Sequence, residues 1–193
     1  MKSRLLTNLC CLALFAGATS VHADSQRALQ AVPEPEPIIR DLRAMMLGLQ
    51  PTDIGLPEKP MHPKVWGVMM DIGYQNTLAT MVVLADGTTS LYLGHGGGVI
   101  GAGQYQHVRS AAEEVLQIAE LHRGAIDSNT SQAPPNVGEV KFHLLTYDGP
   151  VTIQVSEQDL GHNQHRLSAM FHAGHEVIAR MTAASEVRQI AGM

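Results

Sequence analysis

The chain predicts an α+β domain built on a mainly antiparallel five-stranded sheet covered by helices. Strand-like segments are joined pairwise at Asp86-Gly87 and Asp148-Gly149, and Asp-Gly is a strong signal for an antiparallel hairpin. Segments with apolar residues at helical spacing lie before, between and after these hairpins. We therefore expect a three-stranded meander and a separate hairpin to form one sheet, which is an α+β order and not a doubly wound one.

Residues 1–23 have the sequence of a secretory signal peptide. Lys2 and Arg4 precede an apolar run, and Val21-His22-Ala23 is a small-x-small cleavage site. We expect cleavage after Ala23 and a periplasmic or secreted protein. The apolar run is shorter than the roughly 20 residues that span a bilayer, so we expect no membrane span in the mature chain.

Composition excludes several classes of function for the expected mature chain. Both cysteines lie in the signal segment, so disulfides, thiolate nucleophiles and zinc sites with cysteine ligands are excluded. Loss of Lys2 and Arg4 reduces the basic residues from 13 to 11, against 18 acidic ones, which gives a formal charge of −7. Such a chain is a poor ligand for phosphate backbones, and we expect no nucleic acid partner.

The expected domain is preceded by two short regions. Residues 24–37 alternate proline and glutamate and predict an extended tether, and residues 38–63 predict a helix followed by a proline-rich connector without regular structure. The α+β domain is expected at 64–185 and a tail at 186–193. The apolar stripe of the N-terminal helix comprises Ile38, Ile39, Leu42, Met45, Met46 and Leu49.

Strands are expected at 64–74, 77–85, 88–93, 139–147 and 151–156, and helices at 104–123 and from Ser168 onward. In the first strand, strict alternation puts Trp66, Val68, Met70 and Ile72 on one face. Asp71 lies on the other face as the one acid of an otherwise apolar strand. It is interpreted either as a hydrogen-bond acceptor for the following turn or as a catalytic or ligand-binding carboxylate.

A glycine-dense segment, Gly94–Gly103 (the glycine loop), connects the meander to the second helix. It contains G-x-G-x-x-G, but the preceding strand belongs to an antiparallel hairpin and no parallel strand follows the helix, so dinucleotide binding is not expected. One hypothesis is close backbone packing. The other is a nest of N–H groups that holds a small anion, with Gly96, Gly97, Gly98, Gly101 and Arg109 as the candidate ligand-binding residues, helped by His95 or His107.

Two further sets of side chains are candidates for chemistry. Asp71, His95 and Tyr92 are candidate catalytic residues if the glycine loop lines a pocket. His172 and His175 lie one helical turn apart and are candidate metal ligands, although a third ligand must come from elsewhere. No nucleophile motif or pair of catalytic carboxylates stands out, and no cofactor is expected.

Several blocks carry a resemblance to other proteins: WGV-x-MD-x-G from Trp66, ADGTTSLY from Ala85 and GGGVIGAG from Gly96. The chain resembles a group of uncharacterised bacterial proteins that share these blocks, which implies a common fold and no particular activity. In element order it is also similar to roadblock and other profilin-like modules. That similarity implies pairing with a second copy or with a partner protein.

Together these observations favour a non-catalytic interaction module, expected to form a homodimer through a sheet edge or a helix face. The alternative is a small-ligand or hydrolytic site at the glycine loop. A third hypothesis is periplasmic metal binding through His172 and His175.

Overall fold

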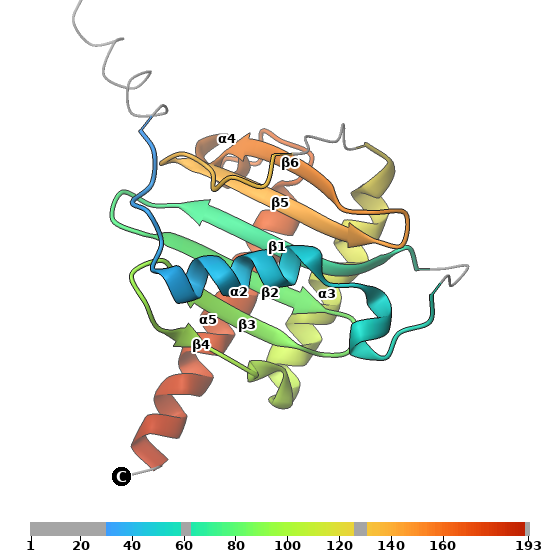
Figure 1. The fold of residues 1–193 in the computed structure, drawn as a ribbon, viewed down its shortest axis with the longest axis horizontal. Helices are drawn as coiled ribbons and strands as arrows, with labels where there is room; N and C mark the ends of the chain where they lie inside the picture. Colours follow the sequence, from blue (N-terminus) through green and yellow to red (C-terminus); the bar gives the residue numbers. More distant parts are fainter. Residues whose placement is uncertain (1–29, 59–62, 126–130, 192–193) are drawn as a thin grey trace, which may run out of the picture.

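The computed structural model describes residues 30–58, 63–125 and 131–191. The expected signal peptide, its cleavage site and residues 24–29 of the expected tether lie outside the described residues. Within the described part, one sheet forms the middle layer of the molecule, with helices on both faces (Figure 1).

All strand pairs in the sheet are antiparallel, in the order β4-β3-β2-β1-β5-β6. The expected meander is formed by β1 (Val65–Gly73), β2 (Leu78–Leu84) and β3 (Thr89–Leu93), and the expected hairpin by β5 (Glu139–Thr146) and β6 (Val151–Ser156). The α+β class is thereby confirmed.

The sheet has six strands where the sequence predicts five. The additional strand, β4 (Gly98–Val99), comes from the glycine loop and pairs with Leu91 and Tyr92 of β3. Sequence patterns miss it because two residues, one of them glycine, carry no alternation.

Helices α3 (Gln106–His122) and α5 (Ser168–Ala191) cover one face of the sheet, behind it in Figure 1. Their apolar stripes pack on the sheet as the sequence predicts. A short helix, α4 (Glu157–Gly161), follows β6, and the 3₁₀ helices η2 (Ala102–Gln104) and η3 (Arg123–Ala125) flank α3. The buried residues of this layer include Val108, Ala111, Ala112, Val115 and Ala119 of α3 and Phe171, Val177 and Met181 of α5.

Helix α2 (Pro37–Gly48) crosses the opposite face of the sheet, in front in Figure 1. It buries Ile39, Met46 and Leu47, but Ile38 and Met45 of the predicted stripe are 66% and 52% exposed. The predicted stripe is therefore wrong at these two positions, because the buried face of the helix is centred on a charged residue, Arg43, which is 7% exposed.

The connector after α2 also departs from expectation. Pro51–Ile54 form a 3₁₀ helix, η1, although the prolines predict no regular structure. Proline at a first helical position has a suitable φ. The N–H of Gln50 donates to Oδ2 of Asp53 at 2.8 Å, and the N–H of Asp53 donates to the carbonyl oxygen of Gln50 at 3.0 Å, which stabilises the turn. Helix α2 and η1 together form the outer layer on this face.

Candidate functional site

Asp71 lies at the centre of the sheet and is completely buried beneath α2. Both carboxylate oxygens accept hydrogen bonds. Thr80, its partner on β2, donates to Oδ1 at 2.6 Å. Arg43 donates to Oδ2 through Nε at 2.9 Å and Nη2 at 2.6 Å. The acid is therefore the buried partner of a helix-borne guanidinium, and the prediction that it accepts bonds from the following turn does not describe its contacts.

His143 of β5 joins the same arrangement and also lies next to α2, with its Nε2 3.3 Å from Nη2 of Arg43. Its Nε2 lies 3.2 Å from Oδ2 of Asp71, and its Nδ1 lies 2.8 Å from Oγ1 of Thr152 on β6. The tautomer with the proton on Nε2 satisfies both contacts, because Nε2 then donates to the carboxylate and Nδ1 accepts from the hydroxyl. Three neighbouring strands and one helix thus meet at a single carboxylate.

The pKa of Asp71 lies below its ordinary value. Burial alone would raise the pKa of the carboxyl group, since it disfavours the charged form. The hydrogen bond from His143 and the charge and hydrogen bonds of Arg43 outweigh burial and keep the carboxylate ionised. The site is therefore an ion pair and not a protonated acid poised for catalysis.

Lys141 is a second buried cation on the same face and is 2% exposed. It pairs with Asp71 in the strand register, and its Nζ donates to the carbonyl oxygen of Ala133 at 2.6 Å. Burial, followed by the positive charge of Arg43, lowers its pKa, while Asp71 and Glu139 oppose the shift. We name the set Arg43, Asp71, Thr80, Lys141, His143 and Thr152 the Asp71 network.

The Asp71 network is closed from above by backbone. Nη1 of Arg43 donates to the carbonyl oxygen of Gln132, at 2.5 Å, and Lys141 bonds the next residue of the same segment. All six side chains of the network are buried and hydrogen-bonded. These hydrogen bonds fix α2 and the segment after residue 131 to the sheet. Because the six side chains are buried, none of them is accessible to a substrate in the folded protein.

The glycine loop packs closely against the neighbouring backbone. A Cβ atom on Gly98 would lie 2.0 Å from the carbonyl oxygen of Leu91, and one on Gly103 would lie 1.8 Å from that of Gly87. Arg109 donates through Nε and Nη2 to the carbonyl oxygen of Gly103, at 3.0 and 2.9 Å. These contacts favour the packing hypothesis for the loop, with Arg109 as a clamp on its C-terminal end.

The remaining predicted ligand-binding glycines serve turns. Gly96, Gly97 and Gly101 have positive φ angles and open space around the Cβ position. Gly96 donates to the carbonyl oxygen of Leu93, and Gly101 donates to Oγ of Ser90. Part of the predicted nest of N–H groups is therefore occupied by internal acceptors.

The structure does not bring the three candidate catalytic residues together. Asp71 is enclosed in its network, and Tyr92 is buried two strands away, where it pairs with Thr80 in the register of β2 and β3. His95 is exposed at the turn after β3. The pocket on which their proposed chemistry depends is not formed by these side chains.

His172 and His175 both lie on α5 but have different surroundings. Nε2 of His172 lies 3.1 Å from Oδ1 of Asn163. The ring of His175 packs edge-on against Phe171, with centroids 4.4 Å apart, and its pKa is lowered by burial and then by the charge of His172. Within the described ranges, no three His, Cys, Asp or Glu side chains are grouped so that they could hold a metal ion.

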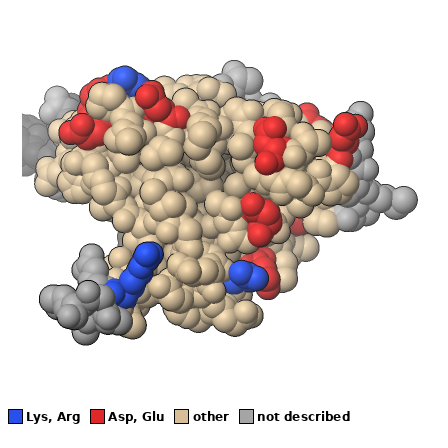
Figure 2. Space-filling view, turned by 60° about the horizontal axis from the view of Figure 1, so that its bottom comes forward, with Lys and Arg blue, Asp and Glu red and all other residues tan. Residues whose placement is uncertain are grey.

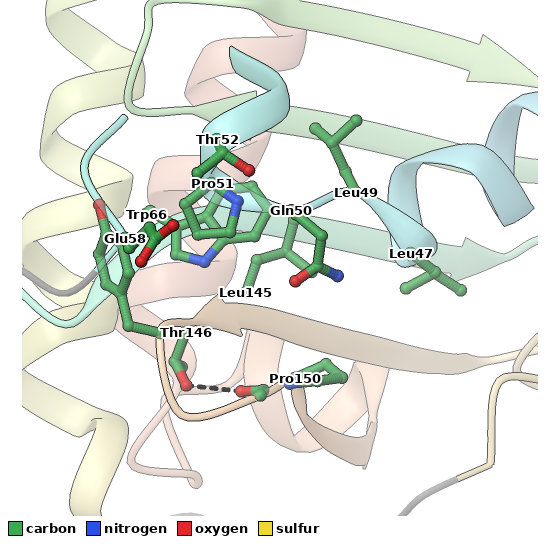
Figure 3. Close-up of a pocket in the computed structure, with 12 residues that line it drawn as sticks. Leu47, Leu49, Gln50, Pro51, Thr52, Glu58, Trp66, Leu145, Thr146 and Pro150 are labelled. Carbon is green, nitrogen blue, oxygen red and sulfur yellow. Dashed lines mark hydrogen bonds between the residues drawn. The ribbon is translucent and has the colours of Figure 1, made fainter. Parts of the chain in front are cut away.

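An open cleft of about 360 Å³ lies beside the Asp71 network, between η1 and the turn that joins β5 to β6. Figure 3 shows it as a ring of side chains around Trp66. The sequence places Trp66 on the same face as Val68, but a register shift between Val65 and Gly67 turns it to the face of α2. A bulge of this kind reverses side-chain direction and has no signal in the alternation.

Most residues of the Asp71 network were not predicted from the sequence. Asp71 was a candidate site residue, but Arg43, Lys141 and His143 were not among the residues singled out. A usable signal was present, because Arg43 is four residues after Ile39 and three before Met46, within the buried stripe of its helix. A cation in such a stripe and an acid in an apolar strand are expected to pair.

None of the helices in the part of the chain that the structure describes has the length and apolarity needed to cross a bilayer. Comparisons with protein-family models, curated proteins and solved structures find no match for this chain.

Proposed function

We propose that the protein is a non-catalytic interaction module that forms a homodimer by pairing β6 with β6 of a second copy. The observation that carries the proposal is the free edge of the sheet. β6 has six residues and lies at the end of the strand order. Among the described residues, no backbone hydrogen bond reaches its outer side. An edge of this length is a template for adding a strand.

The other edge of the sheet is a poorer candidate. β4 has only two residues, and very short edge strands are one way in which proteins prevent edge-to-edge pairing. The hydrogen bonds of the Asp71 network also support a non-catalytic function. Its imidazole contacts its carboxylate, and its amine donates to a backbone carbonyl oxygen, so these groups are already bound within the protein.

The surface charge is consistent with a protein partner. On the face shown in Figure 2, lysine and arginine side chains are isolated from one another, acidic side chains are scattered, and large areas are uncharged. This face offers no dense basic patch for a phosphate backbone.

Two finer expectations belong to the same proposal. A profilin-like or roadblock-like fold is supported by a single antiparallel sheet with α2 on one face and α3 and α5 on the other. A periplasmic or secreted location is supported by the sequence of residues 1–23. Mass spectrometry of the exported protein tests the location, with Asp24 expected as its first residue.

The dimer is tested by light scattering and hydrogen exchange on the purified protein over a dilution series. We expect twice the mass of one chain at high concentration, with slower amide exchange in β6 than after dilution. β4 serves as the internal control, since its exchange should not depend on concentration. A single-chain mass at all concentrations, or a dimer whose β6 amides exchange at a constant rate, would refute pairing through this edge.

A further inference from the structure

The cleft beside η1 has a buried polar atom without a partner. Trp66 is 3% exposed, and its Nε1 has no hydrogen-bond acceptor among the residues that the structure describes. Figure 3 shows the indole among the side chains that line the cleft. Leaving such a donor unpaired costs free energy, and buried indole groups usually have an acceptor.

The missing acceptor contrasts with the adjacent part of the same face. In the Asp71 network even Thr80 and Thr152 have partners, at 2.6 and 2.8 Å. Described residues therefore supply acceptors elsewhere on this face, but none of them supplies one to Nε1 of Trp66, a residue that lines the cleft. A buried unsatisfied group calls for a physical explanation, and a bound acceptor in the cleft would supply one.

The walls of the cleft define the chemistry of an occupant. The lining exposes polar and apolar surface in similar amounts, and the polar groups are uncharged apart from one acid, Glu58. No lysine, arginine or histidine lines it among the described residues, so an anion would face Glu58 without a compensating cation. The lining residues include Leu47, Leu49, Gln50, Pro51, Leu145 and Tyr147.

We propose that this cleft binds a small uncharged molecule with a planar apolar body and a carbonyl group. Because solvent does not reach Nε1 of Trp66 in the unbound structure, binding includes a small rotation of the indole that opens this atom. The carbonyl oxygen then accepts a hydrogen bond from Nε1, and the planar body packs between Leu47, Pro51 and Leu145. The cleft volume of about 360 Å³ is within the range of small-molecule sites, roughly 300–1,000 Å³. This site is separate from the proposed dimer edge and does not depend on it.

The protein contains a single tryptophan, so one NMR signal reports on the proposed donor. We would titrate ¹⁵N-labelled protein with two matched pairs, benzamide against benzoate and nicotinamide against nicotinate. The expected result is a saturable downfield shift of the indole N–H proton with both amides and binding weaker by about tenfold or more with both carboxylates, since these are repelled by Glu58. An indole signal that does not move with either amide would overturn the proposal.

Three variants separate hydrogen bonding from folding. Trp66→Phe keeps an aromatic ring and removes the donor, and it should weaken benzamide binding about tenfold, followed through the amide signals of Leu145 and Tyr147. Glu58→Gln should reduce the preference for benzamide over benzoate while leaving the indole donor in place. Leu121→Ala, at an exposed position of α3, is the control and should change neither value. Equal affinity of the amides for Trp66→Phe and the parent protein would also refute the assigned contact.

Discussion

At the scale of single residues, the most consequential contact is the ion pair between Arg43 and Asp71. It is buried on both sides, and the carboxylate has three different donors. Burying two charges costs desolvation free energy, which only good geometry and further hydrogen bonds offset. The pair thus specifies where α2 lies on the sheet more than it adds to stability.

Breaking this pair from one side should be costly. We expect Asp71→Asn and Arg43→Met each to lower the free energy of unfolding by about 3–5 kcal/mol, because each leaves a buried group without its partner. The double variant should lose less than the sum of the two, since it removes both charges together. Urea denaturation of the four proteins measures the cycle.

The control is the exposed pair of Arg40 and Glu34, whose side chains are 55% and 78% exposed. Arg40→Ala should cost less than about 1 kcal/mol. If Arg43→Met were no more destabilising than Arg40→Ala, the role assigned to the buried pair would be wrong.

At the scale of elements, the main feature of the glycine loop is its close packing against neighbouring backbone. Its ten residues supply the edge strand β4 and lead through η2 into α3. The two closest approaches are made at Gly98 and Gly103 against carbonyl oxygens of neighbouring strands and turns. Glycine is therefore required at these two positions because neighbouring backbone leaves no room for a side chain.

Alanine substitutions should distinguish glycines that pack from glycines that turn. Gly103→Ala forces a Cβ against the carbonyl oxygen of Gly87 and should destabilise the protein by about 3 kcal/mol, because backbone cannot move aside cheaply. Gly97→Ala has open space and only the strain of φ +82°, which costs about 1–2 kcal/mol. Thermal denaturation of both variants tests the order, and the reverse order would contradict the packing role.

Sequence patterns predicted elements better than they predicted contacts. The two Asp-Gly turns and the stripes of α3 and α5 were sufficient for the meander, the hairpin and the α+β class, because those signals are local. The sequence patterns put Trp66 on the wrong face and gave no indication of the roles of Arg43 and His143, for a different reason. The bulge after Val65 and the covering of β5 by α2 depend on residues far apart in the chain, which no local period records.

At the scale of the whole molecule, buried titratable groups make stability depend on pH. The pKa of His175 lies below its ordinary value of 6.5 because burial disfavours the charged ring. As pH falls below 6.5, the unfolded chain takes up a proton at this position before the folded protein does. His175 therefore contributes a loss of stability as the solution is acidified.

Replacing this histidine should flatten that dependence. We expect His175→Leu to lose less stability than the parent protein between pH 7 and pH 5, as judged by urea midpoints, since it has no proton to gain. Val187→Ala, at an exposed position of the same helix, should retain the slope of the parent protein. An unchanged slope in His175→Leu would show that the buried ring does not contribute.

The central position of β1 also has a consequence for how the chain folds. Its neighbours are β2, which follows it directly, and β5, where Lys141 meets Asp71 from seventy residues further along the chain. The meander can form from local contacts, whereas closing the long loop to β5 carries an entropic cost before any contact repays it. Docking of the second hairpin is accordingly the step expected to limit the rate of folding, because only then can His143 donate to the carboxylate of Asp71.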